Sequence, residues 1–254
     1  MLRAVEYLMK TKIGTDKLKC HLHSIVWAWR YLRDRNQHRE LGCLKQYIHP
    51  EAVCIDIGAH AGSWLFPLAR LAPRGQVIGF EALPYYARTL KLTAQLLRVR
   101  NVTVVNQAVT AERCSVPIKW KDSYGKRLTG YTHIATGDEI KEAVIDVQGD
   151  SIDNYLAQQE YKIQFIKCDV EGAEYGVFLG ARKVLARDRP VVYTEFVEHY
   201  LNRYGRARSD ILMIFNELQY SAYALHADGQ LLPVSEPVRW PGNDVCFIPN
   251  EMKV

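Results

Sequence analysis

Short apolar runs alternate with longer amphipathic stretches from residue 52 to the end of the chain. Apolar runs of this length, bounded by turn residues or acids, are typical of buried strands. Because helical stretches separate most of them, the pattern predicts an α/β fold, with a mostly parallel seven-stranded sheet and helices on both faces. The seven runs lie at 52–57, 76–81, 102–109, 162–169, 190–196, 221–225 and 244–249.

The stretches between these runs repeat their apolar residues at helical spacing. Trp64, Leu65 and Leu68 share one face of a helix predicted over 63–72, which Pro73 ends. The same spacing predicts helices over 84–99, 151–158 and 209–218, and one more that turns Val177, Phe178, Ala181, Val184 and Leu185 inward.

Residues 112–149 interrupt this alternation. They carry short β-like pieces, VPIKW, YTHIA and AVIDVQ, separated by polar loops that contain glycine. Such pieces are typical of hairpins. We therefore expect a small antiparallel β insert at about 112–149 within a main domain at 51–254.

The first 50 residues differ from the rest in charge. They hold ten Lys and Arg against four Asp and Glu, while the net charge of the whole chain is +5. We expect a helical N-terminal extension at 1–50. Its basic excess is either a solvated helix surface or a contact with an anionic partner, such as membrane phosphates or an acidic glycan. Aromatic residues interleave with the charges, but no nucleic-acid motif accompanies them, so nucleic acid is not an expected partner.

The composition is that of a soluble globular protein, with 48% hydrophobic and 24% charged residues. No apolar run approaches the roughly 18 residues of a membrane span, and the first residues lack a signal-peptide core. Six cysteines are scattered without CxxC pairs, which favours a reducing compartment over a disulfide framework or a zinc site. We expect a cytoplasmic protein, peripheral at the inner membrane surface if the extension binds lipid. The sequence leaves the oligomeric state open.

The first apolar run leads into CIDIGAHAG, residues 54–62. In a parallel sheet the ligand lies outside the carboxyl ends of the strands, beside the first strand–helix turn. Gly58 and Gly62 would allow positive φ and close approach of a ligand to the backbone. Glu81 ends the second predicted strand, where a carboxylate can accept both hydroxyl hydrogens of a ribose. An adenosine-like ligand is therefore predicted.

The spacing of this turn argues against a dinucleotide. In the GxGxxG fingerprint the second glycine lets a pyrophosphate touch the backbone. Here that position is His60, and the pattern starting at Asp56 is DxGxxxG. A bulky residue at this place suits a ligand without phosphates, such as S-adenosylmethionine. An ordinary tight turn is the alternative interpretation.

Five segments together resemble the FkbM family of S-adenosylmethionine-dependent methyltransferases, from about residue 50 to the end. They are VCIDIGAHAG, VIGFEALP, NQAV, IQFIKCDVEGAEYGVFLGARKVL and PVVYTEF, and KCDVEGAE is the most specific block. The family usually has Asn where this chain has His60. The resemblance implies a Rossmann-like class I methyltransferase fold, S-adenosylmethionine as cofactor, and O-methylation of a sugar, glycan or natural-product hydroxyl.

The resemblance also implies which residues bind the cofactor. Glu81 would hold the ribose. Ala82, Gln107 and Ala108 would border the adenine, although a loop-facing amide is an equal alternative for Gln107. The turn around the methionine part would be formed by Asp56, Gly58, Ala59, His60 and Gly62.

Acidic residues follow the fourth and fifth predicted strands. Asp169 ends the run at 162–169 and Glu195 lies near the end of the run at 190–196, so both would point at the transferred methyl group. A hydroxyl acceptor must lose a proton, which requires a general base or a metal ion. Asp169 and Glu195 are candidates for the base and, by analogy with catechol-type methyltransferases, for ligands of Mg²⁺ or Mn²⁺.

Two further candidates lie near these acids. Glu171 follows Asp169 on the DVEGAE turn, where favourable placement of an acid at a helix N-terminus is the alternative explanation. His199 lies four residues beyond Glu195 and has the side chain whose ordinary pKa, about 6.5, suits proton removal, although a surface histidine is the alternative. His133 in the insert and His60 are weaker candidates for the same role. Methyl transfer to nitrogen or carboxylate, or a non-catalytic adenosine-binding scaffold, are the rival functions.

Overall fold

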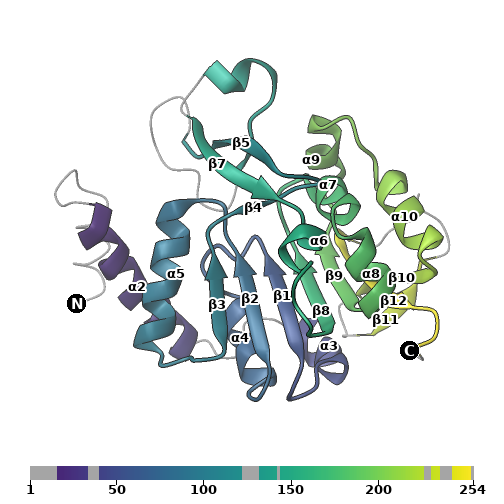
Figure 1. Ribbon diagram of the computed structural model, residues 1–254, viewed down its shortest axis with the longest axis horizontal. Helices are drawn as coiled ribbons and strands as arrows, with labels where there is room; N and C mark the ends of the chain where they lie inside the picture. The colour runs from purple at the N-terminus through teal and green to yellow at the C-terminus, as the bar shows by residue number, and fades with distance from the viewer. Residues whose placement is uncertain are drawn as a thin grey trace.

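The computed structural model describes residues 16–33, 40–121, 132–141, 144–225, 230–234 and 242–252. Its main feature is an eight-stranded sheet with the strand order β11-β10-β12-β9-β8-β1-β2-β3 (Figure 1). The strands are β1 (Val53–Ile57), β2 (Gln76–Phe80), β3 (Val102–Val105), β8 (Ile163–Cys168), β9 (Val191–Glu195), β10 (Tyr220–Leu225), β11 (Leu231–Pro233) and β12 (Asp244–Pro249). Neighbours from β3 to β9 pair in parallel, whereas β12 and β11 each run against the strands beside them.

Helices cover both faces of this sheet, as the apolar pattern predicted. One hydrophobic cluster joins Cys54, Val77 and Phe165 to the first four helices, and the other joins Ile55, Ile166 and the remaining helices. Alternate residues of each strand thus face opposite layers, which is why the central runs are apolar throughout. The first layer is α2 (Asp16–Arg33), α3 (Glu40–Leu44), α4 (Leu65–Leu71) and α5 (Pro84–Leu96); the second is α6 (Ile152–Tyr155), α7 (Glu174–Leu179), α8 (Arg182–Asp188), α9 (Glu198–Arg203) and α10 (Arg208–Glu217).

The prediction of one continuous strand over 102–109 is wrong. The run at 102–109 divides into β3 and a separate strand, β4 (Ala108–Val109). The side chain of Asn106 donates hydrogen bonds to the carbonyl oxygens of Glu81 (2.9 Å) and Ala82 (2.8 Å), so the chain leaves the main sheet there. β4 then pairs with the insert.

Three more elements differ from the prediction. The helix expected around 177–185 is two helices, because the Gly180 carbonyl accepts a hydrogen bond from Asp153 N–H and the Asp153 carboxylate caps the start of α8. The short helix α9 follows β9, and β11 adds an eighth strand to the seven expected. Both are too short to give a clear periodic pattern.

The insert is a second sheet that lies above the carboxyl ends of β1 and β2 (Figure 1). Its strands are β4, β7 (Val144–Asp150), β5 (Cys114–Lys119) and β6 (His133–Ile134), in that order, with the short helix η2 (Gly137–Lys141) before β7. β5 pairs antiparallel with β6 and β7, as expected, whereas β4 pairs parallel with β7. Parts of the predicted insert, 122–131 and 142–143, lie outside the described residues.

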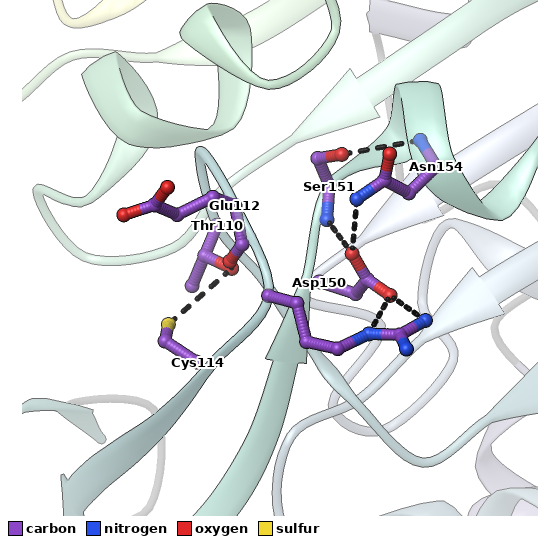
Figure 2. A network of polar contacts seen from close by, with 7 residues as sticks. Thr110, Glu112, Cys114, Asp150, Ser151 and Asn154 are labelled. Atoms are coloured by element: carbon purple, nitrogen blue, oxygen red, sulfur yellow. Dashed lines mark hydrogen bonds and ion pairs between the residues drawn. The ribbon is translucent and has the colours of Figure 1, made fainter.

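Asp150 joins this insert to the main domain (Figure 2). Its carboxylate accepts hydrogen bonds from Ser151 N–H and Asn154 Nδ2, each at 2.9 Å, and from the Arg113 guanidinium at 2.8 and 2.9 Å. Ser151 in turn caps α6 by accepting from Asn154 N–H. Burial opposes ionisation of Asp150, but these donors outweigh it and lower its pKa. The charged carboxylate therefore fixes the end of β7 against β5 and α6.

The N-terminal segment contains α2, α3 and the short helix η1 (Lys45–Tyr47). α2 lies beside α5 (Figure 1), with the rings of Trp27 and Tyr86 5.9 Å apart. Within the described residues, no helix is both long enough and apolar enough to cross a bilayer.

Candidate active site

A cleft of about 840 Å³, including its open mouth, lies at the carboxyl ends of β1, β2 and β8. The main sheet contributes Gly58, Glu81 and Asp169 from the ends of these three strands. The insert covers the cleft with Ile118, Thr132, His133 and Ile134. The site therefore has a wall from the parallel sheet and a wall from the second sheet.

The glycine turn is shaped by contacts within the protein. Gly58 has φ +78°, and a Cβ there would lie 1.9 Å from the carbonyl oxygen of Asp169. Gly62 also has φ +78°, and a Cβ there would lie 2.5 Å from Phe66 Cε2. We expected both glycines to make room for a ligand. Gly58 lines the cleft, but it must lack a side chain mainly because the ends of β1 and β8 approach each other there. Gly62 must lack a side chain because it packs against Phe66 of α4.

Glu81 is buried at the end of β2 and holds this turn in place. Its Oε2 accepts a hydrogen bond from His60 N–H and its Oε1 from Leu83 N–H, each at 2.8 Å. Burial raises the pKa of Glu81 to about 7, against the effect of these two bonds. Each carboxylate oxygen has a second lone pair, so both can still accept a hydrogen bond from a ligand.

A buried lysine lies behind the turn. Lys167 Nζ is 3.4 Å from Asp56 Oδ1 and 3.5 Å from Asp169 Oδ2, and it donates to the carbonyl oxygen of Gly58 at 3.3 Å. Burial alone would lower the pKa of Lys167, but the two carboxylates raise it, so the ammonium stays charged. Asp56 is fully buried and is not part of the cleft wall. Its charge balances Lys167, which in turn positions Asp169 at the cleft.

Further carboxylates gather beside Asp169. Burial, followed by the charges of Asp169 and Glu195, raises the pKa of Glu171 to about 8. Glu171 also has φ +57°, a backbone conformation that non-glycine residues rarely adopt and that is often found at functional sites. Burial and the charges of Asp169 and Asp244 raise the pKa of Glu195. Burial, together with repulsion between carboxylates, thus favours the protonated forms of Glu171 and Glu195.

The acid cluster does not form a metal site in the described residues. No group of three or more His, Cys, Asp or Glu residues there is arranged to hold a metal ion. Asp169 lines the cleft, whereas Glu195 lies outside its wall, so the two expected ligands do not meet in the cleft. The described residues therefore do not support the metal ion expected at Asp169 and Glu195.

The model of the FkbM methyltransferase domain matches residues 56–222, which is more than half of the chain. The chain belongs to the FkbM methyltransferase family. Among solved structures it is similar to a methyltransferase FkbM from Methylobacillus flagellatus KT, with a TM-score of 0.50 and 14% identity over 97% of this chain and 58% of that one. This likeness confirms the class I methyltransferase fold. No curated protein matches the chain.

Two further solved structures are less similar to this FkbM family member. One is SMU.1697c from Streptococcus mutans in complex with S-adenosylhomocysteine, with a TM-score of 0.45 and 12% identity over 83% of this chain and 98% of that one. The other is an rRNA methylase from Streptococcus thermophilus, with a TM-score of 0.45 and 14% identity over 84% of this chain and 95% of that one.

The cleft brings together most of the residues expected to bind cofactor in this FkbM protein. Those that line it are Gly58, His60, Glu81, Ala82, Gln107 and Ala108. Asp56, Ala59 and Gly62 are buried and do not line it. The His60 ring lies 4.7 Å from that of Tyr86 and 6.0 Å from that of Trp27, so the residue that departs from the family pattern packs against α5 and α2.

The four expected catalytic residues separate into two pairs. Asp169 and Glu171 line the cleft. Glu195 ends β9 and lies outside the cleft wall, although its charge helps to raise the pKa of Glu171. His199 is exposed on α9. The structure therefore does not bring the imidazole of His199 to the acids.

Lys167 was not among the candidate site residues from the sequence, and His133 was a weaker candidate for the base than His199. Lys167 was visible as a cation within the apolar run KIQFIKCD, which is a signal for a buried ion pair. His133, in the insert, lines the cleft, and its Nε2 lies 3.2 Å from the Glu139 carboxylate. Only the folding of the insert over the sheet places this imidazole at the site.

Proposed function

We propose that this protein transfers a methyl group from S-adenosylmethionine to a hydroxyl group of a sugar, glycan or natural product. Membership of the FkbM methyltransferase family supports methyl transfer. The observation that supports a hydroxyl acceptor is that two carboxylates, Asp169 and Glu171, line the same cleft as Glu81. The pKa of Glu171, about 8, suits an exchangeable proton near neutral pH.

The cofactor would lie across the carboxyl ends of β1 and β2. Glu81 would accept hydrogen bonds from the ribose hydroxyls through the lone pairs that His60 and Leu83 leave available. Ala82 and Gln107 would border the adenine, and the turn at Gly58 would face the methionine part. S-adenosylmethionine supplies an activated methyl group on a sulfonium, which an in-line nucleophile displaces.

The protein's own groups would prepare that nucleophile. A neutral hydroxyl is a poor nucleophile, and Glu171, in the fraction of molecules in which it is ionised, would take its proton as the oxygen gains the methyl group. Lys167, held by Asp56, would keep Asp169 beside the acceptor. The insert would exclude water and align the acceptor with the methyl group, and alignment supplies much of the acceleration in such displacements.

We also propose a reducing, cytoplasmic setting for this reaction. All six cysteines are thiols, and four of them are buried in the core. Buried thiols behave as small apolar side chains and need no oxidising compartment.

The test uses the full chain and extracts of glycans and metabolites from cells that lack the gene. Incubation with S-adenosylmethionine should release S-adenosylhomocysteine and add the mass of one CH₂ group to an acceptor. Glu171→Gln should lower turnover about 10²–10⁴-fold, as expected for loss of a general base, while the affinity for S-adenosylhomocysteine changes much less.

Glu160→Gln is the matched control, because Glu160 is an exposed glutamate outside the cleft. Full turnover by Glu171→Gln would show that Glu171 is not the base. Methyl transfer only to nitrogen or carboxylate acceptors would overturn the proposed acceptor class. Binding of S-adenosylhomocysteine without turnover on any extract would favour the scaffold alternative.

A further inference from the structure

Helix α2 carries an apolar stripe on its outer side. Leu18, Ile25, Trp29 and Leu32 are 53%, 43%, 40% and 51% exposed, respectively. Their spacing of seven, four and three residues places them on one face of an α-helix. They are four of the ten large hydrophobic residues found exposed in the described part of the chain, although α2 has only 18 residues.

The opposite face anchors α2 to the domain. Cys20 and Trp27 are buried there, and the Trp27 ring lies 5.9 Å from Tyr86 and 6.0 Å from His60. The Tyr31 hydroxyl donates a hydrogen bond to the carbonyl oxygen of Phe66 at 3.2 Å. Because α2 is tied to α4 and α5 by this inner face, its exposed apolar stripe faces away from the protein.

Positive charge borders the stripe on both sides. Lys17 lies on one flank, and Lys19, Arg30 and Arg33 lie on the other, by the 100° rotation of each helical residue. The Arg33 guanidinium lies 4.4 Å from the centre of the Trp29 ring. Asp16 is the one acidic residue of the helix. A polybasic border around an apolar face is the pattern of helices that lie in the plane of an anionic bilayer surface.

We propose that α2 docks in the plane of an anionic phospholipid surface through Leu18, Ile25, Trp29 and Leu32. The flanking Lys and Arg side chains contact the lipid phosphates. The charge pattern favours this occupant over a second copy of the chain, because two copies joined through this face would bring their basic borders together. The docking surface belongs to α2 alone, so this inference does not depend on the proposed reaction.

Sedimentation of the full chain with lipid vesicles tests this inference. The protein should sediment with phosphatidylcholine vesicles that contain phosphatidylglycerol, and much less with phosphatidylcholine alone. Added salt should weaken the binding, because it screens charges at the lipid surface. The double variant Ile25→Ser/Leu32→Ser should bind at least about tenfold more weakly, since it removes two inserted side chains. Lys17→Glu/Lys19→Glu should lose the preference for phosphatidylglycerol.

Met213→Ser on α10 is the matched control, because Met213 is 57% exposed on a helix of the other face of the sheet. It should bind vesicles like the unchanged protein, and thermal melting should show that every variant is folded. Equal binding by Ile25→Ser/Leu32→Ser and the unchanged protein would overturn the proposal. So would a dimer in sedimentation velocity that this double variant dissociates, with no binding to either kind of vesicle.

Discussion

Acidification should weaken the binding of S-adenosylhomocysteine, because the ionised form of Glu81 is the form that accepts ribose hydroxyl hydrogens. Burial raises the pKa of this carboxyl to about 7, despite hydrogen bonds from His60 N–H and Leu83 N–H. Below this pH the protonated carboxyl dominates and presents a hydrogen to the ligand. Binding must then first remove that proton.

The magnitude follows from the ionised fraction. With a pKa of about 7, roughly one tenth of Glu81 is ionised at about pH 6 and roughly nine tenths at about pH 8. If only the ionised form binds, affinity should fall about tenfold between pH 8 and pH 6, or about 1.4 kcal/mol. The direction of the pH effect follows from the raised pKa: affinity is lost as the pH falls below about 7, and it levels off above about pH 8.

Isothermal titration calorimetry at about pH 6, 7 and 8 measures this dependence. Glu81→Gln cannot ionise, so its affinity should be weak and independent of pH over this range. Glu171→Gln is the control, because the pKa of Glu171, about 8, would add a second titration to the same range. The slope should persist in Glu171→Gln. A flat profile for the unchanged protein, or the same slope in Glu81→Gln, would refute the assignment of this carboxylate to the cofactor.

Two substitutions test the structural framework of the site. Gly58→Ala should lower the melting temperature by several degrees, because positive φ costs about 1–2 kcal/mol for alanine and the new Cβ would lie 1.9 Å from the Asp169 carbonyl oxygen. Gly42→Ala is the control and should leave the melting temperature unchanged, because a Cβ at Gly42 would have no atom within 4 Å. An unchanged melting temperature for Gly58→Ala would show that the ends of β1 and β8 can separate at little cost. Asp150→Asn should destabilise the protein by about 1.5–3 kcal/mol, because it removes the charge that accepts from Arg113, Asn154 and Ser151. Asp146→Asn, an exposed position on the same strand, is its control in denaturant unfolding, and equal stabilities of the two variants would contradict the role of the network.

The layered fold follows from the sequence because its signals are local. A central strand such as β1 is apolar on both faces, and α5 repeats its apolar residues every three or four positions, so each pattern is complete within one element. The site residues at the ends of strands could also be predicted from the sequence. Glu81 and Asp169 each follow an apolar run directly, and parallel strands bring such ends to one edge of the sheet. Both side chains line the cleft.

Features of the site that depend on contacts between distant segments could not be predicted from the sequence. His199 follows β9 closely in the chain, yet it is exposed on α9, while His133 reaches the cleft from the insert. The break after β3 depends on bonds from Asn106 to backbone about 25 residues earlier, which no local period contains.

Charge and burial show the same division. The sequence determined which residues of β1, β8 and α2 are apolar, acidic or basic. Tertiary structure alone decided that Asp56 balances Lys167, that burial and neighbouring carboxylates raise the pKa of Glu171, and that α2 turns one apolar face inward and leaves another exposed. The physical reason is that desolvation and Coulomb energies depend on neighbours in space, and these neighbours are set only when distant segments pack together.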